Sequence, residues 1–194
     1  MPIIIFDKDK TFVAISEEEM EISPFESKNN IALMTNLAVK RFENTNIIIG
    51  GLYYSLEIDF LYNALSHFIT EKGRRLNYNL VDSIIVDELK KNAIFIDRLT
   101  DKGDLLNTLF IVNNREMYKI NPYGLVQKVT EDIYLGGRVT SQYGKSLLKI
   151  HKDLKAVDKI KKVYSDIARI RKIGSGKIYV FDTLGNHFVI EGAC

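Results

Sequence analysis

The stretch LFIVNNREMYKINPYGLVQKVTEDIYLGGRVTSQYGKSLLKI, residues 109–150, decides the fold because its hydrophobic pattern changes period partway along. Its first part holds three short runs rich in Val, Ile, Tyr and Phe, separated by the turn sequences NNRE and NPYG, which predicts a β-meander. After the glycine pair Gly136 and Gly137, apolar residues recur three and four positions apart, which predicts a helix. This stretch therefore predicts antiparallel strands that lead directly into a helix.

The rest of the chain has the same arrangement on both sides. Strand-like runs, among them IIIFD, TFVAIS, IALMT (31–35) and NIIIGG, precede two predicted helices, from Leu56 to Ile69 and from about Val81 to about Lys91. A fourth helix begins near Val157, and the runs KIYVFDTL and HFVIEG predict two closing strands. Adjacent helix pairs between blocks of antiparallel strands argue against a parallel doubly wound sheet, in which helices and strands alternate singly. We expect an α+β fold, a four-layer αββα sandwich of two antiparallel sheets flanked by helix pairs.

The composition is that of an ordinary globular protein. With 194 residues, 46% of them apolar and 27% charged, the chain suits a single domain over residues 1–194. No apolar run approaches the roughly 20 residues that a membrane-spanning helix needs, so no membrane partner and a cytoplasmic location are expected. The single cysteine, Cys194, predicts neither a disulfide framework nor a metal cluster, and no cofactor is expected. The net charge of +2 is too small to indicate nucleic acid by itself.

Three ordered segments resemble proteasome β subunits and bacterial HslV, which have the N-terminal-nucleophile (Ntn) hydrolase fold. NIIIGGLYYSLEIDFLYNAL (46–65) resembles their strand, glycine pair and first long helix, and residues 109–150 resemble their central meander and third helix. VDKIKKVYSDIARIRKIGSGKIYVFDTLG (157–185) resembles their last long helix and closing strands. The resemblance covers nearly the whole chain in the family's element order. Because members of this family assemble into rings through their helical faces, it implies a homo-oligomer, either a ring or part of one.

The family's catalytic residues are missing from the matching positions. Its chemistry uses a threonine exposed as the first residue, whose hydroxyl attacks the peptide carbonyl, together with a tuning aspartate and lysine. Matching the first hairpin puts the nucleophile near Pro2, the aspartate at Ser16 and the lysine near Ala38, while Gly50 is retained where the oxyanion amide would lie. The resemblance thus implies a pseudoenzyme, a subunit with a degenerate site that forms or joins an oligomeric assembly and that could hold a peptide or protein partner.

Two enzymatic alternatives remain open. An active threonine peptidase would need a different nucleophile, such as Thr11, which would become the first residue only if the opening strand were removed. A haloacid-dehalogenase-type phosphatase would use Asp7 as nucleophile and Asp9 as general acid, since they follow an apolar run two residues apart. Asp97 and Asp101 resemble the metal-binding acids of such enzymes. The sequence DKDK also fits a charged hairpin turn, and the segment that follows TFVAIS lacks the helix that the phosphatase fold requires.

A row of basic residues marks the last predicted helix. Lys155, Lys159, Lys162 and Arg169 recur at helical spacing, which predicts one positively charged face. Such a face fits ordinary solvation and also fits a docking surface for an acidic partner or nucleic acid. No aromatic residues interleave with the basic ones for base stacking, which argues against nucleic acid.

Overall fold

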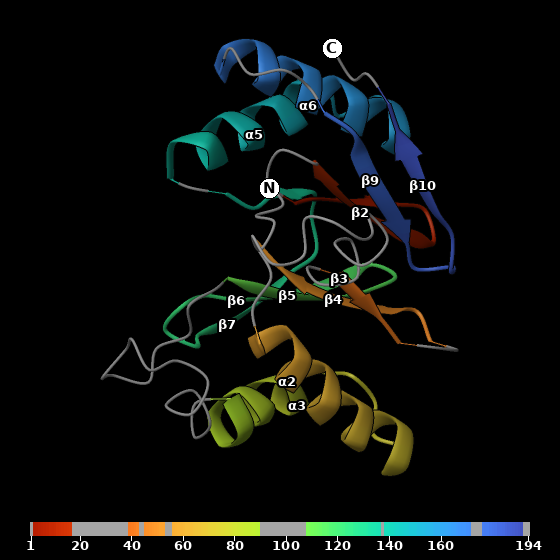
Figure 1. Cartoon of the computed structure of the whole chain (residues 1–194), viewed down its shortest axis with the longest axis vertical. Coiled ribbons are helices and arrows are strands. Elements are labelled where there is room, and N and C mark those ends of the chain that lie inside the picture. Colours follow the sequence, from red (N-terminus) through yellow and green to blue (C-terminus); the bar gives the residue numbers. More distant parts are fainter. Residues whose placement is uncertain are drawn as a thin grey trace, which may run out of the picture. The chain divides into compact units, whose positions relative to one another are not determined.

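The computed structural model describes residues 2–16, 39–42, 45–52, 56–89, 108–136, 138–171 and 176–191. The chain divides into two compact units, and neither is a continuous stretch of sequence. The first unit comprises Met1–Asn29, Asn113–Arg115 and Thr130–Cys194, and the second comprises Asn30–Val112 and Glu116–Val129. Each unit holds one five-stranded sheet and one pair of helices (Figure 1).

The sheet of the first unit is antiparallel throughout, with the strand order β10-β9-β2-β1-β8. Its strands are β1 (Ile3–Asp7), β2 (Lys10–Ser16), β8 (Ile133–Tyr134), β9 (Ile178–Asp182) and β10 (His187–Ile190). A two-residue turn joins β1 to β2, and Lys8 adopts the left-handed φ of 54° that a tight turn of this kind requires.

The helices α5 (Arg138–Ile150) and α6 (Ala156–Arg171) lie side by side and cover this sheet (Figure 1). Alternate strand residues such as Ile3, Ile5 and Ala14 pack in one cluster with the apolar residues of α6. The buried Tyr164 of α6 donates a hydrogen bond of 2.8 Å to the carbonyl of Ala14. The helix face predicted from the apolar spacing therefore packs against the sheet, with a polar contact that fixes its position.

The sheet of the second unit has the strand order β3-β4-β5-β6-β7, with antiparallel pairing of β3 with β4 and of β6 with β7. Its strands are β3 (Val39–Arg41), β4 (Ile47–Gly51), β5 (Leu109–Asn113), β6 (Glu116–Ile120) and β7 (Val126–Val129). Its helices are α2 (Leu56–Ser66), continued by the π-helical turn η2 (His67–Glu71), and α3 (Tyr78–Ile84), continued by η3 (Ile85–Leu89). Asn77 caps α3, because its side-chain oxygen accepts a 2.9 Å hydrogen bond from the amide of Leu80.

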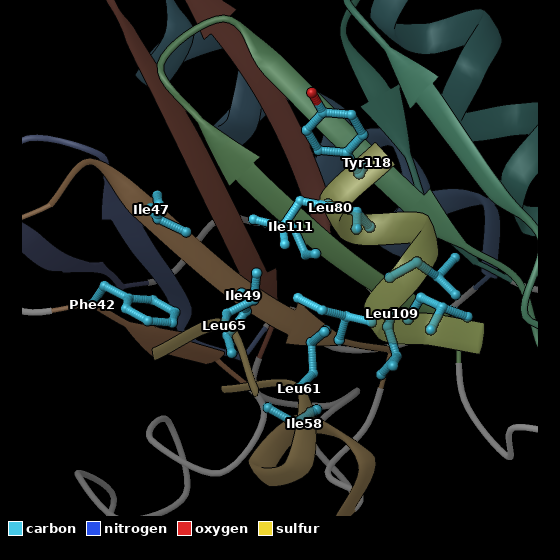
Figure 2. Packing of buried hydrophobic residues seen from close by; sticks show 14 residues of the cluster. Phe42, Ile47, Ile49, Ile58, Leu61, Leu65, Leu80, Leu109, Ile111 and Tyr118 are labelled. Carbon is cyan, nitrogen blue, oxygen red and sulfur yellow. The ribbon is translucent and has the colours of Figure 1, made fainter. Parts of the chain in front are cut away.

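The core of the second unit lies between the sheet and its helices (Figure 2). Side chains of β4 and β5, such as Ile49 and Leu109, meet those of α2, such as Leu61 and Leu65. All four are completely buried, or nearly so, and each contributes roughly 1.5–3 kcal/mol relative to an exposed side chain. This packing explains why the apolar spacing of residues 56–69 predicts the helix correctly.

The predicted fold class is confirmed in its elements: the chain is α+β, with two antiparallel sheets and a pair of helices with each. One prediction was wrong in detail, because the run QKVTEDIYLGG does not form a single strand. It divides into β7, which pairs with β6 in the second unit, and β8, which pairs with Ile3 and Ile4 in the first. The predicted strand at 31–35 and the end of the second helix near Lys91 lie outside the described residues. Within the described ranges, no helix is both long enough and apolar enough to cross a bilayer.

Candidate functional site

Two of the positions that the resemblance assigns to catalysis lie together at one end of the β1–β2 hairpin. Pro2 directly precedes β1, is buried, and accepts a 3.0 Å hydrogen bond at its carbonyl from the amide of Leu135. Ser16 is the last residue of β2 and is half-buried. Because Ile3 pairs with Ala14, the antiparallel register places Pro2 and Ser16 at the same end of the hairpin. This end of the hairpin thus holds a proline and a serine at the positions that the resemblance matches to the nucleophile and the aspartate.

The other two positions belong to the second unit. Gly50 is buried within β4, opposite Val39 of β3. Ala38 lies outside the described residues. Gly50 is therefore a strand residue within a regular antiparallel pair.

Thr11, the alternative nucleophile, is built into the sheet of the first unit. Its side chain is completely buried, its amide donates a 3.1 Å hydrogen bond to the hydroxyl of Thr183, and its carbonyl accepts one of 3.1 Å from the amide of Thr183. To become the first residue, Thr11 would have to lose β1, which pairs with both β2 and β8. That strand contributes the fully buried Ile3, Ile4 and Ile5. Exposure of Thr11 as a terminal nucleophile would therefore dismantle the middle of this sheet.

The sequence DKDK forms a hairpin turn. Asp7 pairs with Lys10 across the hairpin, and the exposed Asp9 forms an ion pair with Arg115, which also donates to the carbonyl of Lys8. Since β1 is antiparallel to both of its neighbours, Asp7 does not lie at the carboxyl end of a parallel strand, as the phosphatase hypothesis requires. Among the residues that the structure describes, no three His, Cys, Asp or Glu side chains are grouped to hold a metal ion. Asp97 and Asp101 fall outside those residues.

A pocket of about 460 Å³ lies beside this turn, between it and the beginning of α6. It is lined by Phe12 and by charged residues of both signs: Asp7, Asp9, Asp158, Lys8, Lys10 and Lys155. Three carboxylates and three ammonium groups leave the lining without net charge. The pocket thus shows no charge preference for either an anionic or a cationic ligand.

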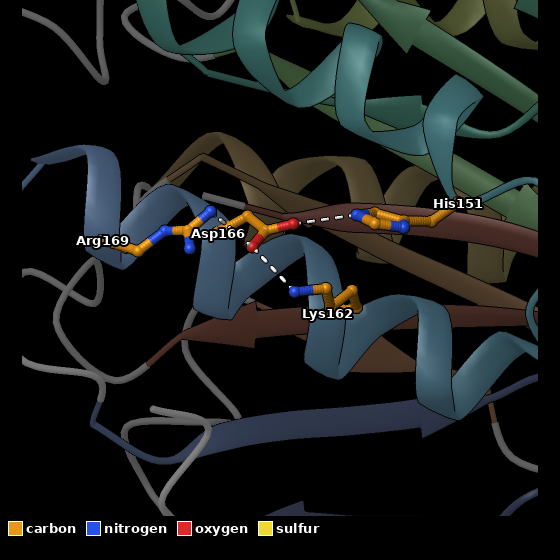
Figure 3. Close-up of polar contacts among 4 residues, drawn as sticks. All are labelled: His151, Lys162, Asp166 and Arg169. Carbon is orange, nitrogen blue, oxygen red and sulfur yellow. Dashed lines mark hydrogen bonds and ion pairs between the residues drawn. The ribbon is translucent and has the colours of Figure 1, made fainter.

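A second polar cluster surrounds Asp166 on α6 (Figure 3). Its carboxylate lies 2.8 Å from Nε2 of His151, 3.0 Å from Nζ of Lys162 and 3.5 Å from Nη2 of Arg169. Only 8% of the Asp166 side chain is exposed, and burial alone would raise its pKa. Hydrogen bonds with His151 and Lys162 outweigh burial, so the pKa of Asp166 is lowered. The cluster joins the end of α5 to the middle of α6. Among the described residues, no serine, threonine or cysteine side chain is hydrogen-bonded to His151, so the cluster holds no pair of a nucleophile and a histidine base.

The predicted basic face of α6 needs one correction, which concerns Lys159. This residue is 7% exposed, and its Nζ lies 2.7 Å from the carboxylate of Asp132. The second oxygen of Asp132 accepts a 2.9 Å hydrogen bond from the amide of Phe6. Lys159 therefore points into the unit and ties α6 to the β1 edge, whereas Lys155, Lys162 and Arg169 are exposed.

Sequence reasoning missed Asp132, His151 and Asp166. Asp166 had a usable signal, because an acidic residue stands among the inward apolar positions of α6, with Lys162 four residues before it and Arg169 three after. Asp132 and His151 had none, since their partners lie 27 and 15 residues away in the sequence.

The lowered pKa of Asp166 predicts a pH-dependent contribution to stability. Because the folded-state pKa lies below the unfolded value, this contribution is present above the unfolded pKa and disappears as the pH falls through the folded one. At neutral pH, Asp166→Asn should lower the free energy of unfolding by about 1.5 kcal/mol, the lower end for hydrogen bonds to charged groups. Urea unfolding at neutral pH and near pH 3 measures this difference, which should shrink in acid. The matched control, Asp153→Asn in the exposed turn before α6, should leave both values unchanged, and an equal loss at both pH values in Asp166→Asn would contradict the assignment.

The fold of this chain is similar to those of known protein structures. No family model matches the sequence, and no curated protein matches it. The crystal structure of eukaryotic HslV from Trypanosoma brucei is similar at a TM-score of 0.62 and 12% sequence identity, covering 93% of this chain and 97% of that one. Thiobacillus denitrificans BPH, solved in complex with epoxomicin, is similar at a TM-score of 0.60 and 12% identity, covering 98% of each chain. The predicted HslV-like, proteasome-type Ntn hydrolase fold is therefore confirmed over nearly the whole chain.

Proposed function

We propose that this chain is a non-catalytic HslV-like subunit, a single domain of residues 1–194 that forms or joins a cytoplasmic oligomeric assembly. The main support for this proposal is the residue Pro2. It stands at the position matched to the nucleophile, it has no hydroxyl, and its carbonyl is bonded to the amide of Leu135. In a comparable protease, loss of the nucleophile alone costs about 10⁶ in rate.

Two further observations support the loss of activity. Ser16, at the position matched to the aspartate, offers a neutral hydroxyl where the family uses a negative charge. Thr11, the nearby threonine, is fully buried in β2, which lies between β1 and β9. Its main-chain amide and carbonyl are both hydrogen-bonded to Thr183. Neither Ser16 nor Thr11 therefore provides the exposed hydroxyl of a first residue, with its own α-amine as base, that the family's chemistry uses.

Assembly is supported by the resemblance and by the surface of the helices. Apolar side chains that are 40–46% exposed occur on the helix pair of the second unit, at Phe60, Tyr78 and Val86. Exposed apolar groups of this kind mark contact surfaces when they gather in patches. Sedimentation of the purified chain is expected to show an oligomer, and a monomer at every concentration would remove this part of the proposal.

Peptidase activity is the decisive test of the proposal. The chain should not hydrolyse fluorogenic peptides that an active HslV cleaves, and incubation with epoxomicin, the ligand of the BPH complex, should add no mass to it. Intact mass also shows whether the chain begins at Met1, Pro2 or Thr11. Turnover that a threonine-directed covalent inhibitor abolishes, together with an adduct on Thr11, would show an active peptidase and overturn the proposal.

A further inference from the structure

The helix pair of the first unit carries a large excess of positive charge. Residues 138–171 contain ten Lys or Arg, three Asp and no Glu, a net charge of +7. The whole chain has 27 basic and 25 acidic residues, a net charge of +2, so the remainder of the chain is net negative. The positive charge is therefore concentrated on one pair of helices and the turn between them.

Most of these ten basic side chains are exposed, and five of them have no acidic partner among the described residues. We define the basic helix face as seven exposed residues of this helix pair: Lys145, Lys149, Lys152, Lys155, Lys161, Lys162 and Arg169. Lys162 and Arg169 contact Asp166, whose buried carboxylate holds them on the α5 side of α6. Among the described residues, no carboxylate lies within ion-pair distance of the other five. Their charge is left to solvent or to a partner.

Exposed apolar side chains lie on the same helices. Tyr143 is 50% exposed, Ile150 69%, Leu154 41% and Ile170 47%. Single exposed apolar residues are normal, but these four alternate with lysines over two packed helices and their turn. Only one of them is aromatic, whereas proteins that bind single-stranded nucleic acid stack bases on aromatic rings. This mixture fits a protein surface that carries both carboxylates and apolar groups better than a nucleic acid.

Among the described residues, neither helix pair of a second copy supplies such a surface. Two copies of the basic helix face would bring like charges together, which opposes association. The exposed part of the other helix pair and its connection carries charges of both signs, because Lys72, Arg74 and Arg75 are exposed and so are Glu71 and Asp87. Neither face of the chain's own helix pairs complements seven basic residues.

We infer that the basic helix face is a docking surface for a different protein, whose contact surface is acidic and carries apolar side chains. The inference goes beyond the proposed function and does not depend on the loss of peptidase activity. Exposed charges of opposite sign would speed and orient the encounter, and the apolar residues would be buried in the complex.

Binding of a synthetic peptide tests this inference. The probe is a fluorescently labelled amphipathic helix with glutamates on one face and leucines beside them, and the reference is a peptide of the same composition in permuted order. Fluorescence anisotropy should show binding of the probe, weakened by added salt, because salt screens exposed charges. Lys145→Gln/Lys149→Gln/Lys152→Gln should weaken binding about tenfold. The control Lys72→Gln/Arg74→Gln/Arg75→Gln removes the same charge from the second unit and should bind like the natural chain.

Each other outcome overturns the inference. Equal binding of the permuted peptide would show charge attraction without a built surface, and no binding of the probe at low salt would remove the surface altogether. Tighter binding of a DNA duplex than of the probe, lost in the same triple variant, would assign the face to nucleic acid. Self-association of the chain that the triple variant abolishes would assign it to a second copy. Peptidase assays on the same samples report separately on the proposed function.

Discussion

Replacing Asp132 by alanine is expected to lower the free energy of unfolding by about 3 kcal/mol. Asp132 fills two roles, because one oxygen lies 2.7 Å from Nζ of Lys159 and the other accepts from the amide of Phe6 at 2.9 Å. Its removal leaves an ammonium group buried without a counter-charge and a strand amide without an acceptor. The pair is not fully buried, since 23% of the Asp132 side chain is exposed, so the loss should fall at the lower end for broken buried ion pairs.

Three variants separate the two roles of Asp132. Asp132→Asn keeps an acceptor for Phe6 and removes only the charge opposite Lys159, so it should cost less than alanine. Asp132→Ala combined with Lys159→Met should recover part of the loss, because an apolar side chain replaces the stranded ammonium. Glu131→Ala, at the exposed neighbouring position, is the control and should change little. Urea unfolding of all four proteins measures the differences, and equal stability of the Asp132→Ala and Glu131→Ala proteins would refute this account.

Gly144→Ala should destabilise the protein by about 2 kcal/mol, although alanine is the better helix former by about 1 kcal/mol. Gly144 lies in α5 against the ring of the buried Tyr134, and a Cβ built there would be 2.1 Å from Cγ of that ring. Burial raises the pKa of Tyr134 to about 12, which reflects how closely this ring is enclosed. The ring cannot give way without disturbing β8, so the clash outweighs the helix propensity.

The same helix provides the control for Gly144. Ser146→Ala, an exposed position two residues on, should change the melting temperature little. Gly144→Ala combined with Tyr134→Leu should regain part of the lost stability, because the smaller side chain makes room for the new methyl group. A Gly144→Ala protein that melts as high as Ser146→Ala would show that the close contact between α5 and β8 is absent.

Local patterns predict the elements of this fold, and contacts between distant segments decide the rest. The periodicity of α5 and α6 and the turn at Lys8 are encoded within a few residues, and the structure follows them. Lys159 is a residue whose placement the local pattern does not predict. Its spacing from Lys155 and Lys162 predicts a shared outer face, but a carboxylate 27 residues away draws it into the unit. In the same way, β8 leaves the meander because Ile3 and Ile4 offer it a pairing partner.

The candidate site was predictable only as far as one hairpin extends. Matching the first hairpin to the family brings Pro2 and Ser16 to one end, and the observed register does the same. The spacing of Lys162 and Arg169 from Asp166 indicates their contacts within α6. No spacing in the sequence indicates that His151 joins them, because the fold creates that contact.

The pairing of β2 with β9 has a consequence for how the protein is made. Phe12 lies opposite Asp182, so this strand pair cannot form until the chain has been synthesised as far as β9. Chains dominated by contacts between residues far apart in sequence fold slowly, because closing the long loops between them costs entropy before the stabilising contacts form. The β1–β2 hairpin, with three consecutive isoleucines in β1, therefore lacks its partner strand β9 until late in synthesis, and it is exposed to aggregation during that time.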